Sequence, residues 1–468
     1  MWKNSNQINY IIFLAIILAG AYLRIYQINF DDYWFDEYVS FWIADPNLSF
    51  SETLKRSYDL DYGTNLLFNI SLKYFFKIFN YDPQIGRFFP AIFGILSIPL
   101  VGYLSYQFDK SKSYLFTTFL ISINWYLISY SQETRSFSLS FFLSVLSIIF
   151  FIKIYDQNIL KINRFLYGFL YIFFSYLGVV NHIFIFIILL AQFLFLLIIN
   201  YKNKKNISFP SACIFAILIM YFITMWQPLM LQLSIKNYWI SQIEIDFFIN
   251  YYFSRFFGSK IMGAIYLVTL IYLIFNFKNK FFIYFNKYLF LLLLLFLSYF
   301  LPIFYGFIFM PILTDRYIIF VLIPILLLIS IFTFNLENTK IKKIILFIII
   351  VSTISNNYLE IFKREHAKPE FNKTFENISK TNFHYIYLKA SDELNKNLLT
   401  NYIKSIKNFD NKKFIILDSN KNIEQNEIWL VCYKAINNFD CSPGKEFDSF
   451  SLKKKINYHL IEATLYSL

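Results

Sequence analysis

A cluster of carboxylates follows the first apolar stretch of the chain. Residues 31–37 read Asp-Asp-Tyr-Trp-Phe-Asp-Glu, so Asp36 and Glu37 come directly after three aromatic residues. Aromatic neighbours reduce the hydration of a carboxylate, and a poorly hydrated carboxylate accepts a proton from a hydroxyl group more readily. The same run is also consistent with an acidic loop exposed to water. We therefore take Asp36 and Glu37 as candidate catalytic residues, with the solvated loop as the alternative.

Three arginines and a histidine stand at the ends of apolar stretches. Arg135 lies in a short polar run between two such stretches, Arg87 and Arg316 each begin one, and His182 separates two more. A guanidinium at the edge of a bilayer is costly without an anionic partner, and arginine binds phosphate through a bidentate fork. These four residues are candidate phosphate ligands. The alternatives are arginines that reach lipid headgroups or pair with Glu133, and a histidine that caps a helix end.

The elements that must position these residues are apolar helices. Hydrophobic residues make up 57% of the 468 residues and charged residues only 16%, whereas a soluble domain carries about 25% charged residues. Stretches of about 18 to 22 apolar residues recur, which is the length that crosses a bilayer. We predict an all-α polytopic membrane protein with about eleven transmembrane helices. The predicted spans are 8–27, 85–107, 113–130, 137–155, 165–181, 183–200, 208–226, 259–277, 288–306, 317–334 and 343–357.

The loops between these spans alternate in charge. One set is basic, as at Lys110 and Lys112, and the other set is acidic and holds the 31–37 run. The positive-inside rule places the basic loops in the cytoplasm, and an odd number of spans then places the C-terminal tail outside. We predict a membrane domain over residues 1–357 of an integral cytoplasmic (inner) membrane protein, with an outer loop at 28–84.

Residues 358–468 are polar and are predicted to form a small soluble α/β domain outside the membrane. The expected strands are His384–Leu388, Lys413–Leu417 and Ile428–Tyr433. Cys432 and Cys441 both lie in this tail, where a disulfide and two free thiols are both open. Amphipathic pieces at Tyr38–Ala44 and Leu66–Phe79 are expected to form helices in the outer loop.

Other classes of site are absent from the sequence. The net charge of +13 comes from lysines and arginines in short loops, which is typical of topology signals and excludes a nucleic-acid partner. The sequence has no glycine-rich nucleotide loop and no Cys/His cluster with zinc spacing.

The order of the short motifs resembles that of the GT-C glycosyltransferases. The similarity extends from residue 8 to about residue 335, and it points to the branch shared by the protein O-mannosyltransferases and the aminoarabinose transferases that modify lipid A. The matching motifs are Leu23-Arg24, Asp36-Glu37, Gly86-Arg87 with Gly94, Gln132-Glu133-Thr134-Arg135-Ser136-Phe137, and Arg316-Tyr317 with Pro324.

This resemblance implies a sugar donor linked to polyprenyl phosphate and an acceptor that is a lipid, a glycan or a protein. It implies transfer on the outer side of the membrane, among membrane lipids, with inversion at the anomeric carbon and with Asp36 as the general base. One departure concerns the Pro-Pro-Leu-Tyr-like segment of many bacterial members, because the aligned residues 59–67 contain no proline. Asp61 and Tyr62 are the acceptor or first-loop candidates there. No cofactor is identified, and a divalent metal between phosphate and acidic loop is left open.

A transporter or a flippase for lipid-linked glycans is the alternative function. Transporters place ionisable residues near the middle of the membrane and interrupt helices there. In this chain the charges gather at the ends of the predicted spans, which favours an enzyme.

Overall fold

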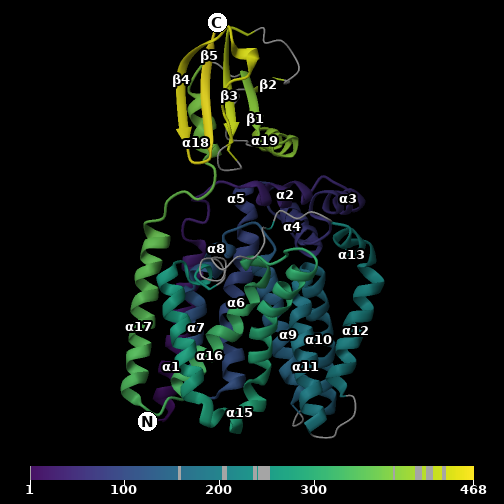
Figure 1. Cartoon of the computed structure of the whole chain (residues 1–468), viewed down its shortest axis with the longest axis vertical. Coiled ribbons are helices and arrows are strands. Elements are labelled where there is room, and N and C mark those ends of the chain that lie inside the picture. The colour runs from purple at the N-terminus through teal and green to yellow at the C-terminus, as the bar shows by residue number, and fades with distance from the viewer. Residues whose placement is uncertain are drawn as a thin grey trace. The chain divides into compact units, whose positions relative to one another are not determined.

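A computed structural model gives the structure of the chain (Figure 1). It describes residues 2–156, 160–202, 208–235, 240, 253–382, 385–405, 414–417, 425–434 and 439–468. The chain forms two compact units, each built from several segments. Unit 1 contains Met1–Tyr26, Asn47–Leu72 and Arg87–Arg364, and unit 2 contains Gln27–Pro46, Lys73–Gly86 and Glu365–Leu468. The boundary of the two domains at residue 357 stays a prediction.

Unit 1 is a bundle of apolar helices that run side by side (Figure 1). Its elements are α1 (Trp2–Ile25), α3 (Phe50–Asp61), α4 (Leu66–Ile78, which continues into unit 2), α6 (Phe88–Phe108), α7 (Ser113–Ile123), α8 (Trp125–Ser131), α9 (Phe137–Tyr155), α10 (Lys161–Asn181), η1 (Ile183–Ile185), α11 (Phe186–Lys202), α12 (Phe209–Thr224), α13 (Trp226–Leu233), η3 (Arg255–Phe257), α15 (Lys260–Ile308), η4 (Asp315–Val321), α16 (Leu322–Phe334), α17 (Thr339–Asn357) and η5 (Tyr358–Phe362).

The predicted fold class is confirmed. Within the described residues, eight helices are long and apolar enough to cross a membrane, and the pair α12 and α13, bent by 78°, is a ninth candidate. Two shorter apolar helices, α7 and Lys260–Asn276, account for the remaining predicted spans. Two of the predicted spans, 259–277 and 288–306, are the ends of the single helix α15. Residues 277–287 between them contain no glycine or proline that would end a helix.

The predicted span 113–130 is broken at Asn124, between α7 and α8. The carbonyl groups at the end of α7 still have partners, because the buried guanidinium of Arg24 donates to Ile121 O (3.0 Å) and Ser122 O (2.9 Å). The side-chain amide of Asn357 donates to the carbonyl of Ile123. A break inside a membrane protein is tolerated where such partners satisfy the backbone.

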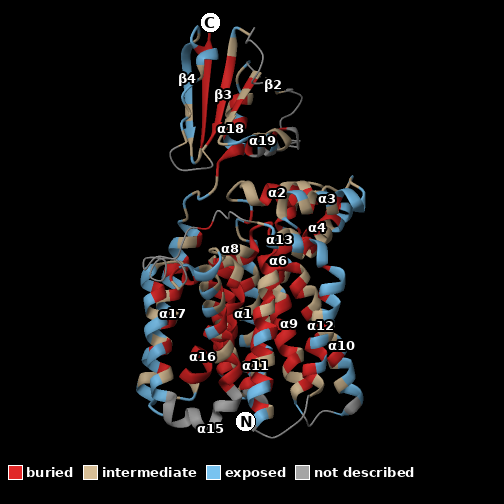
Figure 2. Cartoon of the chain, turned by 45° about the vertical axis from the view of Figure 1, so that its right-hand side comes forward, coloured by how far each residue is buried: buried red, intermediate tan, exposed pale blue. Residues whose placement is uncertain are grey.

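The centre of the bundle is formed by α9 and α16, which are almost wholly buried, whereas α1, α12 and α17 expose apolar side chains (Figure 2). Small residues allow close packing around α9, as where the hydroxyls of Ser147 and Ser175 lie 2.7 Å apart. Apolar side chains that face outward from a helical bundle suit a lipid environment. Together with the length of the apolar helices, they identify a multi-pass membrane protein.

Unit 2 contains a five-stranded mixed sheet with strand order β2-β1-β3-β5-β4. Strand β1 is parallel to β2 and β3, and β5 is antiparallel to β3 and β4. Its elements are α2 (Phe35–Ile43), α5 (Pro83–Gly86), α18 (Phe371–Ser379), β1 (Tyr385–Ala390), α19 (Glu393–Ser405), β2 (Ile415–Leu417), β3 (Glu427–Tyr433), η6 (Lys445–Phe447), β4 (Ser451–Tyr458) and β5 (Ile461–Ser467).

The predicted α/β fold of the tail is confirmed, as are the helices α2 and α4 within residues 28–84. The three expected strands correspond to β1, β2 and β3, although His384 and Lys413 lie outside the described residues. The β4–β5 hairpin was not predicted, because three consecutive lysines hide the alternation of β4. Cys432 at the end of β3 and Cys441 form a disulfide with a Cα–Cα distance of 5.7 Å, which resolves the open question of these thiols.

Candidate functional site

The polar hairpin between α8 and α9 carries the first candidate site residue of unit 1, Arg135. Gln132 anchors this hairpin to the end of α1, since its amide donates to the carbonyls of Leu23 (3.2 Å) and Tyr26 (2.9 Å). The guanidinium of Arg364 donates to the amide oxygen of Gln132 at 3.2 Å. Residues from two distant parts of the sequence therefore fix the position of this hairpin, and with it the backbone of Arg135.

The side chain of Arg135 is 9% exposed and lies between a carboxylate and an aromatic ring. Its Nη2 atom is 3.9 Å from Oδ1 of Asp61, and its guanidinium carbon is 6.0 Å from the ring centre of Phe137. At 3.9 Å the ion pair with Asp61, at the end of α3, is longer than a direct charge-assisted hydrogen bond. Arg135 was predicted as a phosphate ligand and Asp61 as an acceptor or first-loop residue, and the structure brings the two together.

Arg316 approaches the same ring from η4. Its guanidinium carbon lies 5.8 Å from the centre of Phe137 and 6.0 Å from the centre of Tyr317. The neighbouring Asp315 is directed to Arg255, at 3.3 Å. Two of the predicted phosphate ligands therefore share Phe137, which begins α9.

His182 completes this group. Its ring is 4.9 Å from Tyr317 and 6.2 Å from Phe137, centre to centre. Burial, followed by the charges of Arg135 and Arg316, lowers the pKa of His182 to about 3, so the ring is neutral at physiological pH. Its Nδ1 atom accepts a hydrogen bond from the amide of Phe184 (3.4 Å), which leaves the proton on Nε2. His182 can therefore donate a hydrogen bond to an anion without adding charge.

A chain of uncharged side chains braces the Asp61 side of the group. The amide of Asn65 donates to Oδ2 of Asp61 at 2.5 Å, and the Ser136 hydroxyl donates to Asn65. Asn181, at the end of α10, donates to the Ser136 carbonyl (3.2 Å) and to the Ser140 hydroxyl (2.8 Å). This network joins the segment that follows α3 to α9 and α10. No pattern in the sequence predicts it, since amides and hydroxyls have no distinctive spacing.

The remaining unit 1 candidates are Tyr62 and Arg87. Tyr62 is 44% exposed and ends α3 in the left-handed conformation, with φ of 49°. Gly63 follows with φ of 69° and packs against Pro228 and Tyr58. Arg87 is 3% exposed at the N-terminal end of α6. Arg87 and Tyr62 stay predictions of the sequence.

The acidic run lies in unit 2, where Asp36 and Glu37 form the first turn of α2. Asp36 is half-buried. Burial raises the pKa of Tyr433 on β3, and the charges of Asp36 and Asp392 raise it further. Glu37 is fully buried, and its Oε2 atom is 2.9 Å from Nζ of Lys368. The C-terminal sheet and the segment before it therefore contribute side chains around the acidic run.

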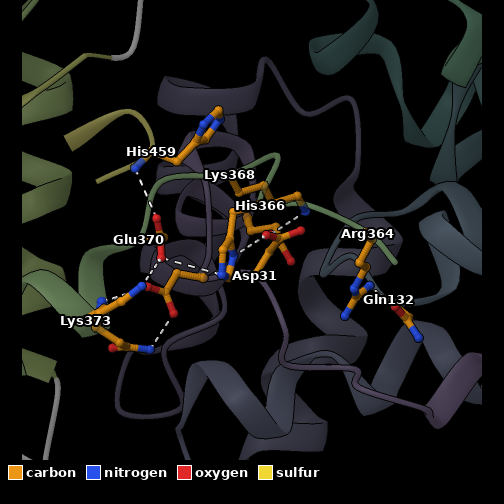
Figure 3. A network of polar contacts seen from close by, with 11 residues as sticks. Asp31, Gln132, Arg364, His366, Lys368, Glu370, Lys373 and His459 are labelled. Atoms are coloured by element: carbon orange, nitrogen blue, oxygen red, sulfur yellow. Dashed lines mark hydrogen bonds and ion pairs between the residues drawn. The ribbon is translucent and has the colours of Figure 1, made fainter. Parts of the chain in front are cut away.

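The other two carboxylates of the run contact α18 and the segment that leads into it. Asp32 accepts hydrogen bonds from the backbone and side-chain amides of Asn372, at 2.7 and 2.5 Å. Asp31 lies 3.1 Å from Nδ1 of His366, whose Nε2 is 3.5 Å from Glu370 (Figure 3). These contacts give Asp31 and Asp32 a structural task within unit 2.

Within the described residues, no group of three or more His, Cys, Asp or Glu side chains is arranged to hold a metal ion. In unit 2, Glu37 instead has a basic partner and Asp32 has amide partners.

Comparison with known proteins gives matches in structure alone. No family model matches the sequence, and no curated protein matches it. The oligosaccharyltransferase of Archaeoglobus fulgidus, in its apo form, superposes with a TM-score of 0.50 and 11% identity, over 80% of this chain and 58% of that one. ArnT from Cupriavidus metallidurans superposes with a TM-score of 0.54 and 10% identity, over 78% of this chain and 66% of that one.

The chain thus spans less than two thirds of the length of each of these proteins. A likeness at 10 to 11% identity concerns the fold. The chain has the GT-C fold that its short motifs resemble, which confirms the sequence resemblance at the level of the fold.

Proposed function

We propose that the chain is a glycosyltransferase that moves a sugar from a polyprenyl-phosphate donor to an acceptor hydroxyl on the outer side of the cytoplasmic membrane. The observation that carries this proposal is the meeting of Arg135, Arg316 and His182 around Phe137, in a bundle of this fold. Two guanidiniums and a neutral N–H donor suit the phosphate of a lipid-linked sugar.

The proposed reaction is a single displacement. The acceptor oxygen forms a bond to the anomeric carbon while the bond from that carbon to the phosphate oxygen breaks, and the configuration inverts. Asp36 takes the proton of the acceptor hydroxyl, and Arg135 and Arg316 bind the polyprenyl phosphate that leaves. A phosphate is already a good leaving group, so no covalent enzyme intermediate is required.

The acceptor is proposed at the level of class. The oligosaccharyltransferase of A. fulgidus has also been described with a tethered acceptor peptide, and in that form it superposes on this chain with a TM-score of 0.51, at 11% identity and over 83% of this chain and 62% of that one. For this chain a lipid, a glycan or a protein acceptor is proposed. Asp61 and Tyr62 are the residues proposed to contact it.

A transfer assay tests this function against transport. Purified protein in proteoliposomes, supplied with radiolabelled polyprenyl-phosphate sugar and a cell-envelope extract, should move label from the donor to a product that chromatography separates from it. Liposomes without protein are the control. Label that crosses the bilayer and stays attached to the lipid would instead establish a flippase.

We further propose that residues 358–468 lie outside the cytoplasm, as the charge of the loops predicts. The Cys432–Cys441 disulfide supports this location, because disulfides persist in oxidising compartments. A cysteine introduced in place of Leu452, which is 58% exposed, should react with a membrane-impermeant maleimide in intact cells.

Tyr201, which is 90% exposed at the end of α11, provides the matched control. A cysteine at this position should react only after the membrane is permeabilised, because the predicted topology places it in the cytoplasm. Labelling with the opposite pattern would reject the proposed topology. The native cysteines do not interfere, since Cys213 is buried and the other two are paired.

A further inference from the structure

The segment between η5 and α18, together with the first turn of α18, contacts the acidic run of the first loop. Three contacts join the two: Asp31 with His366 (3.1 Å), Glu37 with Lys368 (2.9 Å), and Asp32 with the backbone amide of Asn372 in α18 (2.7 Å). All of these residues belong to unit 2. The central contact differs from the others, because one of its two partners has no exposure to solvent.

Glu37 is 0% exposed, and the side chain of Lys368 is 20% exposed. An ionised carboxylate is costly to bury unless a cation pairs with it at close range. Lys368 meets this requirement, and its Nζ atom also lies 5.9 Å from the ring centre of Trp34, the residue that precedes α2. One ammonium group therefore contacts both the cap and the first turn of this helix.

The position of Glu37 determines that of its neighbour. Asp36 and Glu37 occupy consecutive positions in the first turn of α2, and consecutive residues of a helix project in directions set by its fixed geometry. Further along α2, Tyr38 contacts Phe371 (6.0 Å between ring centres), which contacts Tyr433 (5.1 Å). The helix is thus fixed at its first turn by an ion pair and beside it by aromatic packing.

We propose that Lys368 is a positioning residue for the transfer reaction: it holds Glu37, and through the first turn of α2 it sets the direction of the Asp36 carboxylate. This inference rests on the proposed function, in which Asp36 is the base. The segment before the C-terminal sheet then contributes to turnover although it does not contact the reacting atoms.

Two measurements on the full-length protein test this role. Lys368→Met should lower kcat by about 10-fold or more, with the KM for the donor changed by less than about twofold, because misplacing a base affects the chemical step rather than donor binding. Lys368→Arg should recover most of the loss. Hydrogen exchange of the peptide that covers residues 28–46 should become faster in Lys368→Met and return toward wild type in Lys368→Arg.

A double-variant cycle tests whether Lys368 acts through Glu37. If it does, Lys368→Met combined with Glu37→Gln should have about the same kcat as the more impaired single variant, since both break one interaction. Losses that simply multiply would overturn the proposal.

The matched control is Lys453→Met. Lys453 pairs with Glu427, which lies at the opposite end of β3 from Tyr433. This variant also removes a lysine–glutamate pair from unit 2, in this case from the sheet, and we expect it to leave kcat unchanged. An equal loss in Lys453→Met would show that the effect of Lys368 reflects general damage to unit 2.

The outcomes separate this inference from the proposed function. Transfer by the wild type with normal kcat in Lys368→Met would overturn the inference and leave the function standing. Unchanged hydrogen exchange in Lys368→Met would also overturn it. A wild type that transfers no sugar would reject the function, and the positioning role would fall with it.

Discussion

Asparagine in place of Asp36 should lower the turnover number by about 10²-fold or more, while the protein stays folded and inserted in the membrane. An acceptor hydroxyl is a poor nucleophile until its proton has an acceptor, and asparagine keeps the shape of aspartate without accepting that proton. The measurement is single-turnover transfer from a labelled polyprenyl-phosphate sugar, with the protein yield after detergent extraction as the test of folding.

Asp31→Asn and Asp32→Asn are the matched controls for this experiment. Both belong to the same acidic run, and their contacts with His366 and Asn372 give them a structural task. We expect them to reduce turnover much less than Asp36→Asn does. Near wild-type transfer by Asp36→Asn would disprove the proposed base even if the protein transfers sugar.

The second large effect concerns the arginines around Phe137. Arg135→Ala and Arg316→Ala should each lower kcat/KM for the donor by about 10- to 100-fold, which corresponds to the loss of about 1.5 to 3 kcal/mol from a hydrogen bond to a charged group. Lysine at either position should restore only part of the loss, because an ammonium lacks the bidentate fork of a guanidinium. The measurement is initial rate against donor concentration.

Arg164→Ala is the control for loss of a guanidinium on an aromatic ring. Arg164 lies 5.6 Å from the ring centre of Phe209, so it makes the same type of contact as Arg316. The predicted topology places it on the cytoplasmic side, and we expect normal use of the donor. If Arg135→Ala and Arg316→Ala both use the donor as the wild type does, the phosphate lies elsewhere.

Much of the helical fold could be predicted because a bilayer requires long apolar segments, and composition records them directly. The break at Asn124 could not, since the groups that make it tolerable, Arg24 and Asn357, lie far away in sequence. The β4–β5 hairpin was missed for a related reason. Its edge strand carries Lys453, Lys454 and Lys455, which reads as a polar loop although lysines are common on exposed edges.

The candidate site was predictable to the extent that it consists of charged residues at span ends. Arg135, Arg316 and His182 could be selected because charge is costly there. Their convergence on Phe137, and the partnership of Arg135 with Asp61, depend on packing that no local pattern records. No pattern in the sequence distinguishes Lys368, because a single lysine in a polar tail is usually solvated.

The discontinuity of unit 2 has a consequence for how the protein is made. Asp31 and His366 are 335 residues apart in the chain, and α2 buries Val39, Phe41 and Ile43 within a unit whose sheet is synthesised after the helical bundle. At about 5 to 20 residues per second, translation takes tens of seconds to reach that sheet. During this interval the N-terminal segments of unit 2 have no sheet to pack against, so unit 2 completes its folding only after the helical bundle has been made.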